Sequence, residues 1–295
     1  MHMLKCIIIV TYEPELNHLH HLIKNVQNAG FISIIVDNSE KNPITQQMLP
    51  EECKLVSMEG NAGIAAAQNA GIECAKKLGA DIISFFDQDS NAAAKLIMKL
   101  ADYVEIHESC VAAPLALEKD TLLEYPVQNL NRIGYPKDVY VKNAKEPQRV
   151  DLVISSGTMM TMSVLEKVGG FDEDFFIDFV DIEWCLRCKK AGIPIYVLPD
   201  AVLYHKIGNK TIDAGEMKIT VHSPLRTYYK VRNSFLLLYK KINVIFTLRQ
   251  ILPAVIHNFL LIFKVEKRKE YLKYYLLGIL HGICGVKGKY KKGKS

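Results

Sequence analysis

The chain has 295 residues, of which 49% are hydrophobic, and a net charge of +5. This size allows one large domain with an appendage, or two modest domains. Only about six apolar residues precede the Thr-Tyr-Glu-Pro break at residues 11–14, too few for a signal peptide. The seven cysteines, an odd number at scattered spacing, argue against a disulfide framework and for free thiols in a reducing cytosol.

The first part of the chain alternates buried strands with helices. We expect strands at residues 4–12, 31–40, 53–59 and 81–89, and helices at 16–29 and 60–79. This order predicts an α/β fold with an open, mainly parallel sheet and flanking helices. Ligands of such sheets bind beyond the carboxyl ends of the strands. Thr11, Tyr12, Asp37, Asp87 and Asp89 all lie at such ends.

The middle of the chain is less regular. A helix is expected at about 91–107, and residues 118–149 are predicted to form a polar surface excursion. Residues 150–170 predict a strand, a Ser-Ser-Gly turn and a helix, and 171–192 an acidic loop running into a helix. A strand pair within 193–208 is expected to end at His205. The C-x-x-C of Cys185 and Cys188 lacks the second pair that a zinc site requires, so we expect no metal or redox role for it.

Two aspartates follow the fourth strand in "FFDQDS". Asp87 and Asp89 lie on one face of an extended segment, because strand side chains alternate with period two. Two carboxylates held this close repel each other unless a positive group lies between them, and a divalent cation satisfies that need. The alternative is an exposed turn rich in Asp and Ser.

Positive charge is concentrated at the C-terminal end. Residues 264–295 contain ten Lys or Arg and two Glu, a local charge of +8, which leaves −3 for the remainder. Apolar blocks alternate with lysines through residues 236–295, which predicts a basic amphipathic helical region. Its longest uncharged run, Gln250 to Phe263, has 14 residues and includes Pro253, short of the roughly 20 residues that a spanning helix needs. We therefore expect peripheral contact with an anionic membrane; the alternative is packing on the rest of the chain or on a second subunit.

Several motifs, taken together and in this order, resemble glycosyltransferase family 2, and most closely its bacterial rhamnosyltransferases. They are "VTYEP", "VDNSE", "GNAGIAAAQNAGI", "FFDQDS", "SGTMMTMSVLEKVGGFDEDFFIDFVDIEWCLR", "YHKIG" and "SPLRTYYKVRNSFLL". The resemblance spans about residues 4–240. It implies a GT-A fold, a nucleotide-sugar donor, a divalent metal and inversion at the anomeric carbon. It also implies a catalytic domain at 1–235, with a donor half at about 1–115 and an acceptor half at about 116–235, followed by the helical region 236–295.

The resemblance assigns the metal and the base. Mg²⁺ or Mn²⁺ would neutralise the charge that develops on the leaving diphosphate. Asp89 is the expected direct ligand, His205 matches a further metal position, and Asp87 lies near the ribose or the metal. Asp181 matches the catalytic base, although Val180 replaces the acid that commonly precedes it, and Glu183 is the next candidate. The alternative for these acids is that they favour the positive end of a helix.

The resemblance also implies nucleotide contacts. Thr11 and Tyr12 would lie beside the base, and Asp37 would accept the N–H of a thymine or uracil ring. Asp37 also fits a plain turn. Asn61 and Gly63 are expected in the wall of the donor pocket, since "GNAG" fits neither common phosphate-loop pattern. Asn69 is expected to line the pocket from a helix, and Trp184, with Glu183, to contact the acceptor unless it is a core residue.

The function expected from these motifs is transfer of L-rhamnose from dTDP-β-L-rhamnose to a saccharide on polyprenyl diphosphate. It would take place in the cytoplasm, at the inner face of the cell membrane. A galactofuranosyl- or other hexosyltransferase that uses a UDP-sugar is the main alternative. A non-catalytic subunit would be expected to lack Asp89, Asp181 or His205, and a Rossmann oxidoreductase would need a glycine fingerprint that is missing here. Nucleic acid is not an expected partner, and oligomerisation is left open.

Overall fold

The computed structural model describes residues 3–205, 211–214, 217–240 and 242–291. An eight-stranded sheet forms its centre, in the order β3-β2-β1-β4-β9-β5-β10-β8. The parallel strands on one side are β1 (Lys5–Thr11), β2 (Ile32–Asp37), β3 (Lys54–Ser57) and β4 (Ile82–Asp87). Beyond them, β9 (Met159–Thr161) runs antiparallel to β4 and β5 (Val111–Glu118), and β10 (Ile195–His205) runs parallel to β5 and antiparallel to β8 (Gln148–Val150). The predicted open, mainly parallel sheet is confirmed.

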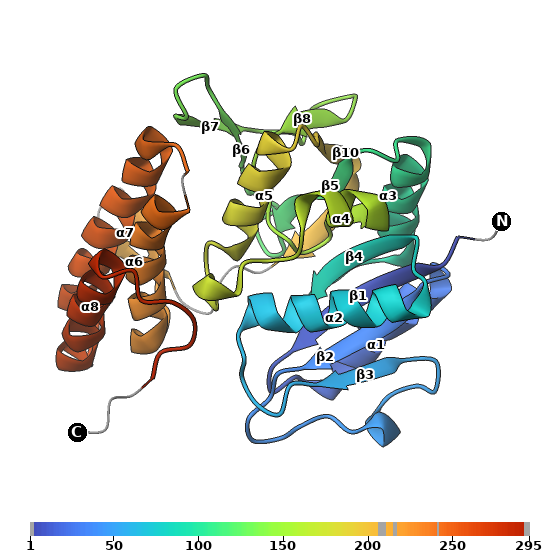
Figure 1. Cartoon of the computed structure of the whole chain (residues 1–295), viewed down its shortest axis with the longest axis horizontal. Helices are drawn as coiled ribbons and strands as arrows, with labels where there is room; N and C mark the ends of the chain where they lie inside the picture. The colour runs from blue at the N-terminus through green and yellow to red at the C-terminus, as the bar shows by residue number, and fades with distance from the viewer. Residues whose placement is uncertain (1–2, 206–210, 215–216, 241, 292–295) are drawn as a thin grey trace.

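Helices cover both faces of this sheet, which explains its uninterrupted apolar strands. One core contains Ile7 and Ile9 and lies under α1 (Leu16–Asn28) and α3 (Ala94–Ile106). The other contains Ile8 and lies under α2 (Ile64–Leu78), α4 (Met162–Val168) and α5 (Val180–Lys190). Figure 1 shows α2, α4 and α5 in front of the sheet. All seven cysteines are free thiols, as expected, and Cys185 and Cys188 are buried in α5, where burial raises the pKa of both.

Three expectations for the middle of the chain need correction. Within 118–149, a hairpin of β6 (Val127–Leu130) and β7 (Pro136–Val139) and the edge strand β8 are ordered. The strand expected before the Ser-Ser-Gly turn lies after it, as β9, because the turn bonds to the end of β4 through Gly157 N–H and Phe85 O (2.6 Å). The expected strand pair after residue 193 is one strand, β10, whose register shifts between Leu198 and Val202. Pro199, which has no N–H to donate, lies within that shift.

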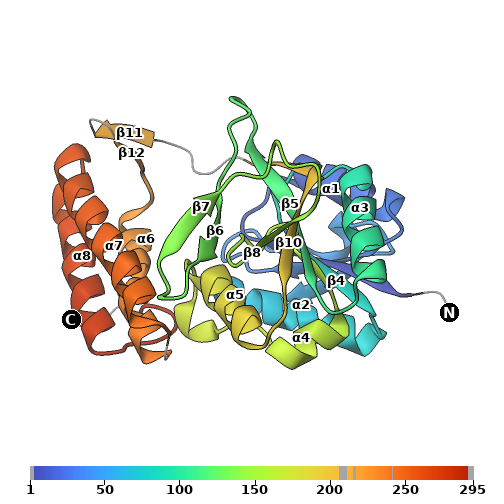
Figure 2. The same ribbon diagram turned by 90° about the horizontal axis from the view of Figure 1, so that it is seen from above.

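The remaining elements are short turns of 3₁₀ helix, a hairpin and a C-terminal helical unit. They are η1 (Gln46–Met48), η2 (Glu173–Phe175), β11 (Thr211–Ala214), β12 (Met217–Thr220), α6 (Pro224–Tyr239), α7 (Val244–Lys264) and α8 (Arg268–Ile283). The last three helices pack together on one side of the sheet domain (Figures 1 and 2). The expected domain boundary at residues 235 and 236 falls inside α6. Among the described residues, α7 is the single helix long and apolar enough to cross a membrane, by length and composition.

Helix α6 binds the backbone at the end of η2 and in the segment that leads from η2 to α5. Asn233 is fully buried, and its Nδ2 lies 2.8, 2.6 and 3.0 Å from the carbonyl oxygens of Phe175, Ile177 and Asp178. The guanidinium of Arg232, also fully buried, donates from Nη2 to Phe175 O at 2.9 Å. These bonds satisfy the carbonyls of Ile177 and Asp178, and they add to the bond that Phe175 O accepts from Ile177 N–H at 2.7 Å.

The bound segment is strained. Phe176, Asp178 and Phe179 have φ of 63°, 61° and 67°, in the left-handed region that non-glycine residues rarely adopt. The ring of Phe176 stacks on Tyr229 of α6, with centroids 4.8 Å apart and 16° between the ring planes. Such conformations cost roughly 1–3 kcal/mol each and persist only where the surroundings enforce them. The C-terminal helices are therefore part of the structure that shapes this segment.

The basic end of the chain returns to the sheet domain. Gly288 N–H donates to Asp174 O at 2.8 Å, and Arg232 Nη1 donates to Gly288 O at 2.6 Å. Lys287 pairs with Asp174 at 3.0 Å and Lys289 with Glu40 at 3.3 Å. At least these two lysines of the basic region pair with acids of the same chain, and the described residues that carry them pack on the sheet domain.

Candidate active site

A cavity of about 1110 Å³ opens at the carboxyl ends of β1 and β4. This is the edge at which the strand order predicts a ligand site. One wall comes from strand ends and the start of α2: Thr11, Tyr12, Asn38, Asn61, Gly63, Gln68, Asp87, Gln88 and Asp89. The opposite wall comes from the strained segment and the C-terminal helices: Asp178, Asp181, His222, Arg226, Lys230, Gln250, Pro253, Ala254, His257 and Asn258. The cavity thus lies between the sheet domain and the helical unit.

Gln88 joins the two central strand ends. Its Oε1 accepts from Tyr12 N–H at 2.7 Å, and its Nε2 donates to Tyr12 O at 3.2 Å. Gln88 is the middle residue of the Asp-Gln-Asp motif, and Asp87 and Asp89 line the cavity on either side of it. The side chain of Tyr12 is 44% exposed, so its ring is available to a ligand.

Asp37 occupies a different environment from the one expected. It is buried, and its Oδ1 accepts from the hydroxyls of Thr11 (3.0 Å) and Ser39 (2.7 Å), while its Oδ2 accepts from Ile44 N–H (2.9 Å). It does not line the cavity. Here Asp37 orders the loop that follows β2, and the expected bond to a pyrimidine N–H stays a prediction.

Asn38, which the sequence did not single out, reaches the cavity instead of Asp37. Its Oδ1 accepts from Ala62 N–H at 2.7 Å, and its Nδ2 donates to Asn61 Oδ1 at 3.3 Å. Gly63 lies beside the strained segment with φ of 95°, and a Cβ there would come within 2.6 Å of Phe176 O. The "GNAG" turn therefore needs its second glycine for the close approach of the two walls.

Asp181 lies in the first turn of α5 and is partly exposed to the cavity. The pKa of its carboxyl is raised from 3.8 to about 6: burial is the largest cause and the charges of Asp178 and Asp87 add to it, while the hydrogen bond from Ile182 N–H at 2.9 Å opposes the rise. A carboxylate with this pKa is a stronger base than an exposed one and is still ionised at pH 7. Its position and protonation both suit a general base.

Positive side chains of α6 face these acids. Arg226 pairs with Asp178, with Nη2 and Oδ1 3.0 Å apart, and Lys230 lies one turn further along the helix. His222 precedes α6, and burial, together with Lys230 and Arg226, lowers its pKa to about 4. The sequence analysis did not identify these residues. A signal was available, because the Ser223-Pro224 helix start places Arg226 and Lys230 four residues apart on one helix face.

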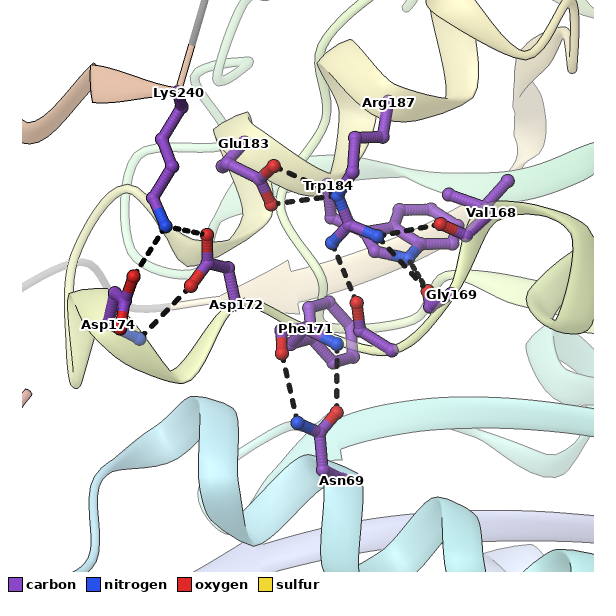
Figure 3. Close-up of polar contacts among 11 residues, drawn as sticks. Asn69, Val168, Gly169, Phe171, Asp172, Asp174, Glu183, Trp184, Arg187 and Lys240 are labelled. Atoms are coloured by element: carbon purple, nitrogen blue, oxygen red, sulfur yellow. Dashed lines mark hydrogen bonds and ion pairs between the residues drawn. The ribbon is translucent and has the colours of Figure 1, made fainter. Parts of the chain in front are cut away.

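Three expected site residues serve the scaffold (Figure 3). Asn69 Oδ1 accepts from Phe171 N–H at 2.8 Å, and its Nδ2 donates to Phe171 O at 2.9 Å. Glu183 is buried and pairs with Arg187 Nε at 2.9 Å. Trp184 is buried in the core and donates from Nε1 to Gly169 O at 2.9 Å. None of the three lines the cavity, so the contacts expected of them with donor or acceptor find no geometric support.

The cavity is lined by side chains that suit a hard divalent cation. Among the described residues, no group of three or more His, Cys, Asp or Glu side chains is arranged as a metal site. The side chain of His205 lies outside the described part of the chain. The carboxylates that line the cavity are Asp87, Asp89, Asp178 and Asp181. Their oxygens are the ligands that Mg²⁺ and Mn²⁺ prefer. A bound cation would also reduce the repulsion by which Asp178 and Asp87 add to the effect of burial on the pKa of Asp181.

Known proteins resemble this chain in sequence over most of its length. The family model described as "Glycosyl transferase family 2" matches residues 6–169. The "dTDP-rhamnosyl transferase RfbF" of Shigella flexneri is 38% identical over 283 residues, which are 95% of this chain and 96% of the relative. The "Low-salt glycan biosynthesis hexosyltransferase Agl10" of Haloferax volcanii is 26% identical and covers 96% of this chain and 92% of its own length.

Solved structures share the fold at low identity. The structure of S. aureus TarS 1-349 in complex with UDP-GlcNAc has a TM-score of 0.53 and 14% identity, over 96% of this chain and 84% of that one. GalNAc-T7 with UDP, GalNAc and Mn²⁺ has a TM-score of 0.55 and 12% identity, over 79% of this chain. The match spans about half of the GalNAc-T7 chain (51%). At these identities the likeness concerns the fold alone.

The raised pKa of Asp181 gives a prediction for stability. The folded state binds the proton of Asp181 more tightly than the unfolded state does. Protonation therefore stabilises the folded state in full below about pH 4, and this stabilisation is lost as the pH rises through about 6. The Asp181→Asn variant has no charge at this position. The difference between its free energy of unfolding and that of wild type should therefore rise by about 2–3 kcal/mol between pH 4 and pH 8. Denaturant unfolding of the metal-free protein measures this difference. The exposed Asp102 of α3 provides a control, Asp102→Asn, in which no such rise is expected; a flat difference for Asp181→Asn would contradict the assignment.

Proposed function

The chain belongs to glycosyltransferase family 2, and from this premise we propose that it transfers L-rhamnose from dTDP-β-L-rhamnose to a lipid-linked glycan, with inversion and with a divalent metal. The observation that carries the donor assignment is the 38% identity with a dTDP-rhamnosyl transferase over nearly the whole of both chains. A match of this extent covers both walls of the cavity, including the segments with Asp181, Arg226 and Lys230. The motif "FIDFVDIEWCLR" supports the same donor.

In the proposed reaction, Asp181 takes the proton of the acceptor hydroxyl while that oxygen attacks the anomeric carbon from the side opposite the leaving dTDP. Direct displacement with one base inverts the anomeric configuration, so β-linked rhamnose gives an α-rhamnoside. The raised pKa of Asp181 favours this proton transfer near neutral pH. Asp87 and Asp89 would hold the cation, which when bound neutralises charge on the diphosphate. Tyr12 and Asn61 in the strand-end wall are the proposed nucleotide contacts.

A UDP-hexose donor is the second candidate. It is supported by the hexosyltransferase of Haloferax volcanii, which matches 96% of this chain at 26% identity. The polar wall of Tyr12, Asn38, Asn61 and Gln68 offers hydrogen bonds to a pyrimidine ring of either kind. The choice between thymidine and uridine donors therefore needs a direct measurement.

We predict turnover with dTDP-β-L-rhamnose and none with UDP-glucose, UDP-galactose or UDP-galactofuranose. Purified protein, a polyprenyl-diphosphate saccharide and MnCl₂ are incubated with each donor, and lipid-linked product is followed by mass spectrometry. A chelator should abolish turnover, and replacement of Mn²⁺ or Mg²⁺ should restore it. Turnover with a UDP-sugar and none with dTDP-rhamnose would make the second candidate correct.

Two variants test the roles of Asp181 and Asp89 in this assay. Asp181→Asn should lose roughly 10²–10⁴-fold in rate while binding dTDP as wild type does, because a base acts in the transition state. Asp89→Ala should weaken both the binding of Mn²⁺ and the binding of dTDP. If Asp181→Asn keeps most of its rate, Asp181 is not the base.

We propose also that the helical unit rests on the cytoplasmic face of an anionic membrane, where a lipid-linked acceptor would be found. The exposed side of α7 carries an unbroken apolar stripe: Ile245, Leu248, Leu252, Ile256, Phe259 and Phe263. Leu272, Leu276, Leu280 and Ile283 form a second exposed stripe on α8, with Lys269 and Lys273 beside it. The other side of α7 lines the cavity with Gln250, His257 and Asn258, which favours lying at the interface over spanning.

Flotation with liposomes tests the membrane proposal. Wild type should float with phosphatidylglycerol vesicles more than with phosphatidylcholine vesicles, since each lysine near an anionic surface contributes about 1 kcal/mol. Leu248→Gln with Leu252→Gln should reduce recovery on both. The matched control is Leu122→Gln with Leu123→Gln, two exposed leucines of the sheet domain. Equal recovery of wild type on both vesicle types would contradict the proposed electrostatic attraction. Recovery of the α7 variant equal to that of wild type would contradict the proposed apolar contact.

A further inference from the structure

Among the residues that the structure describes, the cationic side chain of Lys230 in the cavity has no hydrogen bond or ion pair. Arg226 and Lys230 project from the same face of α6, and the guanidinium of Arg226 is taken up by the carboxylate of Asp178, at 3.0–3.3 Å. The ammonium of Lys230 lines the cavity without a hydrogen bond or ion pair to any residue that the structure describes. The two cations are one helical turn apart, and within the described part of the chain Arg226 forms an ion pair with Asp178 while Lys230 forms none.

Besides Asp178, which pairs with Arg226, the carboxylates of Asp87, Asp89 and Asp181 line the same cavity as Lys230. Burial lowers the pKa of Lys230, Asp178 opposes this and Arg226 adds to it. His222 is uncharged near neutral pH, because burial and the neighbouring cations lower its pKa to about 4. The wall that α7 contributes consists of Gln250, Pro253, Ala254, His257 and Asn258, none of which is acidic. The cavity thus has an acidic side, at the carboxyl end of β4 and the start of α5, and a cationic side on α6.

A partly buried ammonium that has no ion-pair partner is costly, so a charged lysine at this place favours an anionic ligand. Phosphate oxygens are strong acceptors for such a donor, and charge-assisted hydrogen bonds of this kind are about twice as strong as neutral ones. If the proposed function is correct, both substrates carry a diphosphate: the nucleotide sugar and the lipid-linked acceptor.

We propose that Lys230 binds a phosphate group of a substrate diphosphate, and that the pairing of Arg226 with Asp178 leaves this task to Lys230 alone. The identity of the two diphosphates rests on the proposed function, whereas the expectation of an anionic ligand rests on Lys230 itself. The structural alternative is that Lys230 only offsets the acidic side of the cavity. That role requires a positive charge at residue 230, and it predicts no preference for ligands that carry phosphate.

Binding measurements on the full chain separate these roles. Isothermal titration with Mn²⁺ present compares dTDP and UDP, as donor-side probes, with farnesyl diphosphate, as an acceptor-side probe. Thymidine, uridine and farnesol are the phosphate-free controls. Lys230→Gln is compared with the charge-keeping Lys230→Arg and with Lys24→Gln, which removes an exposed lysine of α1.

Lys230→Gln should weaken the binding of at least one diphosphate tenfold or more and leave the phosphate-free controls unchanged, whereas Lys230→Arg should recover most of the affinity. A loss confined to the nucleotides identifies the donor diphosphate, and a loss confined to farnesyl diphosphate identifies the acceptor. Wild-type binding of UDP but not dTDP would refute the proposed donor and leave this inference standing. The inference is overturned if Lys230→Gln binds every diphosphate as wild type does, if it loses the phosphate-free ligands equally, or if wild type binds none of the diphosphates.

Discussion

The hydrogen bonds from Asn233 and Arg232 to the backbone of residues 174–178 are the constraint on which the site depends. They fix a segment whose Phe176, Asp178 and Phe179 would otherwise leave the left-handed region. Because α5 begins directly after this segment, its conformation determines where Asp181 enters the cavity. Strain of this size at a functional position is maintained by neighbouring structure, and here the neighbour is α6.

The same contact makes the C-terminal helices part of the enzyme. The family model ends at residue 169, before Asp181 and before all three C-terminal helices. The sheet domain supplies the strand-end wall, with Asp87 and Asp89, and α6 and α7 supply the cationic wall. Lys240 at the end of α6 pairs with Asp172 and Asp174, at 2.5 and 2.6 Å, which ties the helix to the sheet domain a second time (Figure 3). A membrane contact through α7 would therefore lie directly behind one wall of the cavity.

Much of the fold could be predicted from the sequence because it depends on local patterns. The apolar runs of β1, β2 and β4, and the position of Asp87 and Asp89 after β4, follow from strand periodicity and from the rule for strand ends. The roles of Asn69 and Trp184 could not be predicted in this way, because Asn69 bonds to Phe171 about a hundred residues further along the chain, and Trp184 to the carbonyl of Gly169. The role of Asp37 could not be predicted from its position either, because a carboxylate at the end of a strand can order its own loop or face a ligand. The sequence places Arg226 and Lys230 on one face of a helix, but the packing of α6 against the strained segment is what brings that face into the cavity.

Hydrogen–deuterium exchange of Asn233→Ala, compared with wild type, tests most directly whether α6 holds the catalytic segment. Loss of the bonds from one buried amide group should lower the free energy of local opening by about 2 kcal/mol, and so speed exchange across residues 175–183 roughly 30-fold. Peptides from β1 and β4 should exchange as in wild type, which separates local release from general unfolding, and Asn17→Ala on the exposed face of α1 should change neither region. Unchanged exchange across residues 175–183, with full transferase activity, would contradict the account.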